Sequence, residues 1–380
     1  MRVGERVEME NRAASPEGLT FVPRFPYHGV MLPMTLRRFA LLLPLLLAGE
    51  IRAQKRFDVE RFFADNFIVD GLGTYYDGPA GDAFPYPSRE GPWDFKPLKQ
   101  ETGCNMIIMS YRTQPTFELQ ADRLAKGVYR NPRLIRTFGD VRDIRTSGEF
   151  GVLMYVQMPY PLGGDVKKLG DLYERGLRVF QLAYGAQQTD QAPEDVIGYG
   201  NDQEGGVTPF GERVIAELNR LGMLVDISHC NEQTTLDACR LSKAPVVCTH
   251  AGARSLTDRD RNKSDRAIKA IAATGGIVGV TAVGWIIENP KTKERGIDEF
   301  CDHLDHMRKL IGVDQIAVAT DSPLRGWDRL SPHRTSPELS DIGHWKTVAT
   351  ELHRRGYTED ELKKVFGLNW ATLLRKVLEP

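Results

Sequence analysis

Short apolar runs alternate with longer amphipathic segments along most of the chain. Eight of the short runs are rich in Val, Ile, Leu and Met and are bounded by Gly, Pro or Asn, which is typical of strands buried on both faces. The pattern predicts strands at Asn66–Asp70, Cys104–Ser110, Gly151–Gln157, Arg178–Ala183, Leu224–Ser228, Pro245–Thr249, Ile277–Ala282 and Gln315–Thr320.

The longer segments carry helical periodicity together with start and stop signals. In the clearest one, Thr208–Leu221, Thr208 is a candidate N-cap, Pro209 follows it and Gly222 ends the apolar stripe. The same signals predict helices at Asp265–Thr274, Ile297–Ile311 and Trp345–Arg355, and two further helices within the segment 113–148.

The alternation of strands and helices predicts an α/β fold of the (β/α)8 TIM-barrel type. Such barrels have about 250 residues, which is close to the length over which the predicted strands are spread. An open doubly wound sheet is the alternative, but the G-x-G-x-x-G loop that often opens its first helix is absent from this sequence.

The N-terminal part of the sequence has a different pattern. A basic pair, Arg37-Arg38, precedes an apolar run that is too short to span a bilayer comfortably, and Ala53 offers a cleavage site. We therefore interpret residues 34–53 as a signal peptide, residues 1–33 as an extension before a true start at Met31 or Met34, and residues 54–380 as one barrel domain. Export to the periplasm or the cell exterior is expected. The alternative is an uncleaved anchor, which would associate the chain with a membrane.

Composition and charge narrow the classes of partner. The chain has 380 residues, of which 41% are hydrophobic, and a net charge of −1, so no bulk electrostatic attraction to nucleic acid is expected. Five cysteines at spacings that fit no zinc ribbon are interpreted as buried small apolar residues, at least one of them unpaired in an exported protein.

Candidate chemistry stands at the carboxyl ends of the predicted strands, where barrels carry their active sites. His229 follows the fifth strand, His250 the sixth and Asp321 the eighth. Two imidazoles on neighbouring strands plus a carboxylate suit zinc or a similar divalent ion, which would activate water for hydrolysis with Asp321 as general base or ligand. In contrast, the first strand ends in Asp70-Gly-Leu-Gly, without a histidine.

Other polar residues allow more than one interpretation. Arg261, in the loop after His250, could clamp a substrate carboxylate or lie in a solvated charged loop. His303 and His306 lie three residues apart on a predicted helix whose apolar stripe covers the barrel, so we interpret both as solvated or capping.

Several of these motifs together resemble the membrane dipeptidase family, also called renal dipeptidase. The resemblance implies a barrel of the metallo-dependent hydrolase (amidohydrolase-like) type, export, a two-zinc dipeptidase site and a possible homodimer. It runs in order along the chain, through Leu-Val-Asp-Ile-Ser-His229, Ala-Pro-Val-Val-Cys-Thr-His250, Arg261-Asn-Lys-Ser-Asp, Gly275-Gly-Ile-Val-Gly-Val, Asp302-His-Leu-Asp-His and Gly367-Leu-Asn369.

The resemblance implies roles at matching positions. In the family, a His-x-Asp after strand 1 and a bridging Glu after strand 3 hold one zinc, and one His each after strands 5 and 6 holds the second. His229 and His250 match this last pair, Asp321 matches the aspartate that handles the proton, and Arg261 matches the arginine that binds the substrate carboxylate. Tyr184 falls where the family has a histidine that contacts substrate.

Three departures from the family pattern affect the metal site. Leu72-Gly-Thr74 replaces His-x-Asp, and Gln157 replaces the bridging Glu. Leu72 cannot coordinate a metal, and Thr74 and Gln157 are neutral and weak ligands. We therefore predict one Zn²⁺ rather than two, at His229, His250 and Gln157, with Asp321 as catalytic residue or further ligand.

The predicted function is hydrolysis of a dipeptide or another small amide, with Arg261 and Tyr184 binding the substrate. The alternative is a non-catalytic secreted barrel that binds a small ligand or partner. A third interpretation has Asp70, Tyr76 or Asp77 supplying replacement ligands from the strand-1 loop. The turn from Thr74 to Trp93 is expected to form part of the mouth of the site.

Overall fold

The structure is a computed structural model that describes residues 57–74, 94–111, 114–158, 161–185, 192–322, 324, 336–341 and 343–379. The proposed extension, the signal peptide and most of the turn from Thr74 to Trp93, with Tyr76 and Asp77, lie outside the described residues. The expectations for those segments therefore stay predictions.

Eight parallel strands form the barrel, in the order β1-β2-β4-β5-β6-β7-β8-β9, and β3 pairs with β4 outside this path. All eight predicted strands are present, with shifted ends, and the prediction of a (β/α)8 barrel is confirmed. The strands are β1 (Val69–Gly73), β2 (Met106–Tyr111), β3 (Pro132–Leu134), β4 (Phe150–Val156), β5 (Leu177–Gln181), β6 (Leu224–Asp226), β7 (Val246–Ala251), β8 (Val278–Thr281) and β9 (Ile316–Ala319).

The first and last strands meet through hydrogen bonds just beyond the end of β9. The main-chain N–H of Asp321 donates to the carbonyl of Leu72 over 2.8 Å, and that of Thr74 donates to Ser322 over 3.0 Å. The buried carboxylate of Asp70 adds a bond, because its Oδ1 accepts from the N–H of Thr320 at 3.0 Å. Residues distant in sequence are thereby brought together at the carboxyl end of the barrel.

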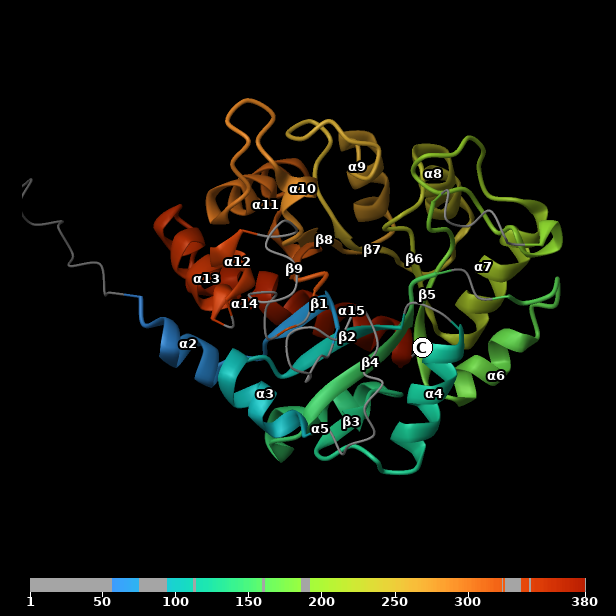
Figure 1. The fold of residues 1–380 in the computed structure, drawn as a ribbon, viewed down its shortest axis with the longest axis horizontal. Coiled ribbons are helices and arrows are strands. Elements are labelled where there is room, and N and C mark those ends of the chain that lie inside the picture. Colours follow the sequence, from blue (N-terminus) through green and yellow to red (C-terminus); the bar gives the residue numbers. More distant parts are fainter. Residues whose placement is uncertain are drawn as a thin grey trace, which may run out of the picture. The chain divides into compact units, whose positions relative to one another are not determined.

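Helices surround the strands (Figure 1). Thr208 caps α7 by accepting from the N–H of Gly211, and Gly222 ends it in the left-handed conformation, as the sequence signals predicted. The segment 113–148 holds the two expected helices, α4 and α5, but also the unpredicted β3 between them. The α-helices are α2 (Val59–Asp65), α3 (Phe95–Thr102), α4 (Gln114–Ala125), α5 (Phe138–Ser147), α6 (Lys168–Glu174), α7 (Pro209–Leu221), α8 (Glu232–Leu241), α9 (Asp265–Ala273), α10 (Gly284–Ile287), α11 (Ile297–Ile311), α12 (Pro337–Ser340), α13 (His344–Arg354), α14 (Glu359–Lys363) and α15 (Asn369–Leu378). Two 3-10 helices, η3 (Pro193–Asp195) and η4 (Val313–Gln315), and one π-helix, η5 (Lys364–Leu368), are also present.

Alternate residues of the strands supply two apolar cores. In β2, Met106 and Ile108 belong to one cluster with Leu153 and Val247, while Ile107 and Met109 belong to the larger cluster that includes residues of the surrounding helices. This alternation follows from the two-residue period of a strand whose faces are both covered. Among the described helices, none is long and apolar enough to cross a membrane.

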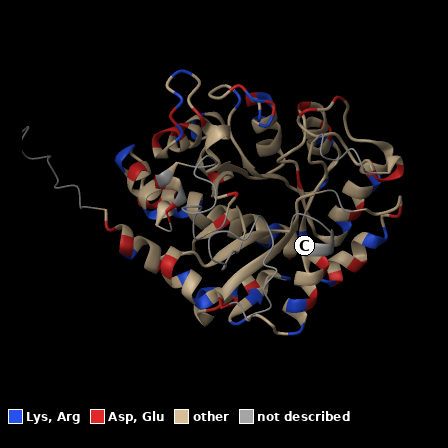
Figure 2. Cartoon of the chain, viewed as in Figure 1, with Lys and Arg blue, Asp and Glu red and all other residues tan. Residues whose placement is uncertain are grey.

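Charged residues occur mainly in the helices and loops, with both signs interspersed, and the strands carry few of them (Figure 2). All five cysteines are free, and four of them are buried, as expected of small apolar residues. Ionisable groups are seldom buried, so those that are buried at the barrel ends must be stabilised by specific contacts.

Asp70 predicts a measurable pH dependence of stability. Burial raises the pKa of its carboxyl from 3.8 to about 7, against the opposing effect of its hydrogen bonds. The folded state therefore holds a proton that the unfolded chain releases near pH 4, so the free energy of unfolding should fall as the pH rises from about 4 to 7. A difference of about three pKa units corresponds to about 4 kcal/mol.

Urea unfolding of the native protein and of Asp70→Asn at pH 5 and pH 8 tests this prediction. Because the asparagine does not titrate, the variant should lose less stability between these pH values than the native protein. All other titrating groups are common to both proteins and cancel in the comparison. An equal loss in both would show that Asp70 titrates normally.

Candidate metal centre

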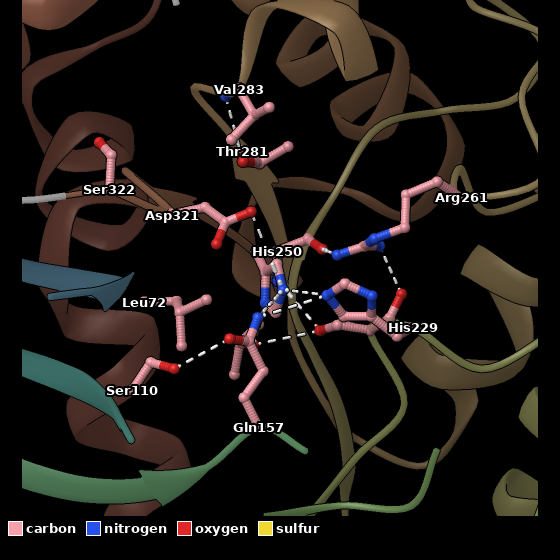
Figure 3. Close-up of polar contacts among 12 residues, drawn as sticks. Leu72, Ser110, Gln157, His229, His250, Arg261, Thr281, Val283, Asp321 and Ser322 are labelled. Atoms are coloured by element: carbon pink, nitrogen blue, oxygen red, sulfur yellow. Dashed lines mark hydrogen bonds and ion pairs between the residues drawn. The ribbon is translucent and has the colours of Figure 1, made fainter. Parts of the chain in front are cut away.

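Four side chains meet at the carboxyl end of the barrel (Figure 3). Gln157 directly follows β4, His229 lies in the turn after β6, His250 lies near the end of β7, and Asp321 follows β9. In Figure 3 the two imidazoles and the Gln157 amide point toward one another, and the Asp321 carboxylate points toward His250 from the opposite side to Gln157. The residues predicted from strand ends are thus brought together by the barrel.

The atoms that face one another form a nearly equilateral triangle. His229 Nε2 and His250 Nε2 lie 3.1 Å apart, and the Gln157 amide nitrogen lies 3.3 Å from the first and 3.1 Å from the second. Ligands of a tetrahedral zinc ion, at bond lengths of 2.0–2.1 Å, lie roughly 3.3 Å apart. The spacing of the two imidazole nitrogens therefore fits two ligands of one small divalent ion, and the Gln157 amide occupies the position of a third.

Both imidazoles are held in the neutral form. Burial, followed by the positive charge of Arg261, holds the pKa of His229 and of His250 well below the usual value. His250 Nδ1 lies 2.7 Å from the hydroxyl of Thr249, and His229 is hydrogen-bonded to the main chain of Tyr184. With Nδ1 protonated in these bonds, each Nε2 presents its lone pair to the centre of the triangle.

Groups from the two neighbouring strands anchor Gln157, one through its side chain and one through its main chain. Ser110 of β2 donates to its Oε1 over 3.0 Å, and the Gln181 amide donates to its main-chain carbonyl. In this orientation the amide N–H groups face the two imidazole lone pairs. The opposite orientation is also compatible with Ser110, since a hydroxyl accepts as well as donates, and it would present the amide oxygen as a ligand.

Asp321 stands outside the triangle but close to it. Its Oδ2 lies 4.0 Å from His250 Nε2, and its side chain is 22% exposed. The backbone at Asp321 adopts a φ of 50°, in the left-handed region that non-glycine residues seldom enter. This conformation occurs at the point where β9 joins β1, and such local strain is common at functional sites.

The strand-1 side of the site is filled with apolar and neutral groups. Leu72 is 1% exposed, and a Cβ added at Gly73 would lie 2.7 Å from Thr320 Oγ1 and 2.9 Å from Ile107 Cδ1. Within the described part of the chain, no group of three or more His, Cys, Asp or Glu side chains could hold a metal. The candidate ligand set for an ion is therefore two histidines and an amide, with Asp321 just outside it.

A buried carboxylate beneath the site joins the two histidine strands. Asp226 accepts from the N–H of Ser228 at 2.7 Å and from the N–H of Thr249 at 2.9 Å. Burial raises the pKa of Asp226, and its main-chain hydrogen bonds oppose this effect. These bonds lie directly beside His229 and His250 and help to set their separation.

Arg261 and Tyr184 both contact the segments that carry the two histidines. Arg261 is 3% exposed, and its guanidinium donates to the carbonyl of Ser228 and, over 2.8 Å, to that of His250. The Tyr184 ring stacks on His229 with centroids 4.1 Å apart and an angle of 17°. Their roles in substrate binding stay predictions.

The two histidines of α11 serve the loop after β7. His303 is buried, so it is not solvated, and its Nδ1 accepts from the N–H of Ala253 at 2.8 Å. His306 pairs with Asp265, the first residue of α9, at 2.8 Å. Together these contacts tie both ends of the loop that carries Arg261 to α11.

Sequence reasoning did not identify three residues that support the site. Ser110, Thr249 and Lys263 hold Gln157, His250 and the His229 turn respectively. A small polar residue at the end of a buried strand was the available signal for the first two. Lys263 lies next to Asn262 in the loop after β7, and its sequence position does not distinguish a buried lysine from a solvated one.

The fold is a (β/α)8 barrel of the type found in metallo-dependent hydrolases, and two histidines meet at its carboxyl end. Residues 111–379 match the family described as membrane dipeptidase, peptidase family M19, and the chain belongs to this family. The family consists of metallopeptidases, in agreement with the resemblance noted in the sequence.

Individual relatives agree with this assignment. Dipeptidase tcpJ of Claviceps purpurea is 26% identical over 70% of this chain, a match that spans only 58% of that protein. An amidohydrolase from Pseudomonas aeruginosa has a similar fold, with a TM-score of 0.69 and 22% identity over 85% of this chain and all of its own. A metallopeptidase from Rhodobacter sphaeroides, liganded with a phosphinate mimic of the dipeptide L-Ala-D-Ala, gives a TM-score of 0.66 at 22% identity over 82% of this chain and all of its own.

Proposed function

We propose that this protein is a metal-dependent hydrolase of dipeptides or similar small amides that uses one zinc ion. The observation that carries the proposal is the triangle of His229 Nε2, His250 Nε2 and the Gln157 amide, with its sides of 3.1 to 3.3 Å. A zinc ion held there would polarise the amide carbonyl and lower the pKa of a bound water. Family membership and the dipeptidase relatives support the substrate class.

The charge of the site supports one ion rather than two. Relative to the ligand set that the family resemblance implies, Thr74 and Gln157 replace two carboxylates by neutral groups. The loss of two negative charges equals the charge of one divalent ion, so a second ion would lack both its ligands and its compensating charge. Leu72, buried where a histidine would project, leaves that half of the site apolar.

Asp321 is the residue for proton transfer. Its carboxylate lies at the partly exposed edge of the site, 4.0 Å from His250 Nε2, where a water and a substrate can approach. It accepts a proton from the attacking water as the C–O bond forms and returns it to the amine nitrogen as the C–N bond breaks. The charge of Arg261 beside the imidazoles favours an anionic group such as a dipeptide carboxylate at the site.

A specific observation also favours a second function, a metal-free barrel that binds a ligand without catalysis. In the orientation present, the Gln157 amide donates toward both imidazoles while Ser110 donates to its oxygen, so the polar atoms satisfy one another without an ion. The loss of strand-1 ligands fits this function equally well. Metal content separates the two.

The test is zinc content per chain, measured by elemental analysis after exposure to zinc and removal of the excess, with hydrolysis of Ala-Ala dipeptides followed in parallel. One ion per chain with hydrolysis is expected. Asp321→Asn should keep the ion and lose about 10²–10⁴-fold of the activity, since a general base contributes an effect of this size. No ion would establish the metal-free function, and two ions would overturn the one-metal proposal.

A further inference from the structure

Lys263 is a buried lysine that forms no ion pair with a carboxylate in the part of the chain that the structure describes. Its side chain is 2% exposed, and none of the ion pairs among the described residues involves it or Arg261. Lysine is seldom buried in this way, because removing an ammonium group from water costs several kcal/mol unless hydrogen bonds replace the hydration. Its position must therefore be maintained by the contacts of its ammonium group.

These contacts are made to the turn that carries His229. The ammonium donates to the carbonyl of Cys230 over 2.6 Å and lies 3.4 Å from the hydroxyl of Thr235. Cys230 directly follows His229, and its own N–H closes the turn by donating to Ile227 over 3.0 Å. Lys263 therefore holds the main chain on the C-terminal side of the histidine.

Three consecutive carbonyls of this turn are bonded to groups outside it. Arg261 donates to Ser228, the N–H of Asn201 donates to His229 over 2.8 Å, and Lys263 donates to Cys230. Each peptide plane around His229 is thus fixed from a different direction. Since the imidazole direction depends on these planes, the position of Nε2 depends on the same bonds.

The backbone of Lys263 is anchored beside the other histidine. Its N–H donates to Gly252 over 3.0 Å, and its carbonyl accepts from Arg254 at 2.9 Å. Gly252 lies two residues beyond His250. One residue thereby connects the ends of the two strands that carry the imidazoles.

We infer that Lys263 is a positioning residue of the metal centre: its ammonium group fixes the His229 turn relative to His250 and sets the separation of the two Nε2 atoms. The inference rests on the proposed metal-binding role of this histidine pair. Two effects of Lys263 on zinc affinity oppose each other. By holding the His229 turn in place it strengthens binding, whereas its positive charge by itself weakens the binding of a cation.

Lys263→Met tests this inference, since methionine keeps much of the apolar stem and removes both charge and donors. Zinc affinity, measured by competition with a chromogenic chelator, should fall about 10–100-fold, the usual effect of removing an outer partner of a metal ligand. Lys263→Gln, which keeps an N–H donor without the charge, should recover at least part of that loss. Lys99→Met is the matched control, because Lys99 also donates to a main-chain carbonyl, that of Glu149 at 3.3 Å, but outside the site.

Each outcome decides the inference. Tighter zinc binding by Lys263→Met would show that charge dominates, and unchanged affinity with lower thermal stability would show a merely structural role; both overturn it. If the native protein binds no zinc, the proposed function fails, and ¹⁵N spectra of the histidine rings still decide the positioning role. The His229 signals should then shift or broaden in Lys263→Met and not in Lys99→Met, and unchanged signals would overturn the inference.

Discussion

Replacing His229 with alanine is expected to abolish zinc binding and hydrolysis together. The triangle of donors would lose one corner, leaving His250 and a neutral amide 3.1 Å apart, too few ligands for a stable site. Loss of outer partners alone costs 10–100-fold in affinity, so loss of a direct ligand should cost at least about 100-fold. Elemental analysis and chelator competition measure both effects.

His353→Ala provides the control for this prediction. His353 lies in α13 and its ring contacts Phe57 and the carbonyl of Tyr357, outside the metal centre. The control should keep one ion per chain and full activity. If His229→Ala retained the ion, other side chains would be its ligands, and the assignment of the site to His229, His250 and Gln157 would be wrong.

Restoring the family's ligands should convert the site from one ion to two. The triple variant Leu72→His, Thr74→Asp, Gln157→Glu places an imidazole and two carboxylates where this chain has an apolar and two neutral side chains. The carbonyl of Leu72 accepts from the N–H of Asp321 at 2.8 Å, so a histidine at position 72 would start from the end of the barrel that carries Asp321. Zinc content should rise from one to two per chain, and the melting temperature should become strongly zinc-dependent.

Without zinc the same variant should be less stable than the native protein. It exchanges a leucine that is 1% exposed for an imidazole and introduces a carboxylate at Gln157, which is 8% exposed, without an ion to balance the charge. A matched variant, Leu72→Gln with Thr74→Asn, makes similar steric changes without adding ligands of strong type and should still bind one ion. If the triple variant also binds only one zinc ion, the missing ligands are not the reason for the single ion. Close packing around Gly73 and Thr320 would then exclude the second ion.

The sequence was sufficient to predict the barrel and the approximate place of the site. Alternating buried strands and amphipathic helices permit few other architectures, and parallel strands place their carboxyl ends on one side. His229, His250, Gln157 and Asp321 each follow or end a strand, so their approach to one another followed from topology. The short strand β3 was missed because its three residues carry no periodicity.

The roles of the loop residues could not be read in the same way. Arg261 was expected either to clamp a substrate carboxylate or to lie in a solvated loop, and the structure instead buries it against the carbonyls of Ser228 and His250. Lys263, with its buried ammonium, and Ser110, with its bond to Gln157, have no sequence signal that separates them from ordinary polar residues. Such contacts join residues 33 to 47 positions apart.

What the sequence by itself determined is therefore the fold class, the family and the set of side chains at the carboxyl end of the barrel. The hydrophobic periodicity of each segment predicts the fold class, and a few residues at strand ends indicate the family and the site. Only the tertiary structure decided that two imidazole nitrogens and an amide lie 3.1 to 3.3 Å apart, and that buried cations hold the turn around His229. These distances depend on strand register, on the closure of β1 against β9 and on main-chain bonds between distant loops, none of which is encoded in any single segment.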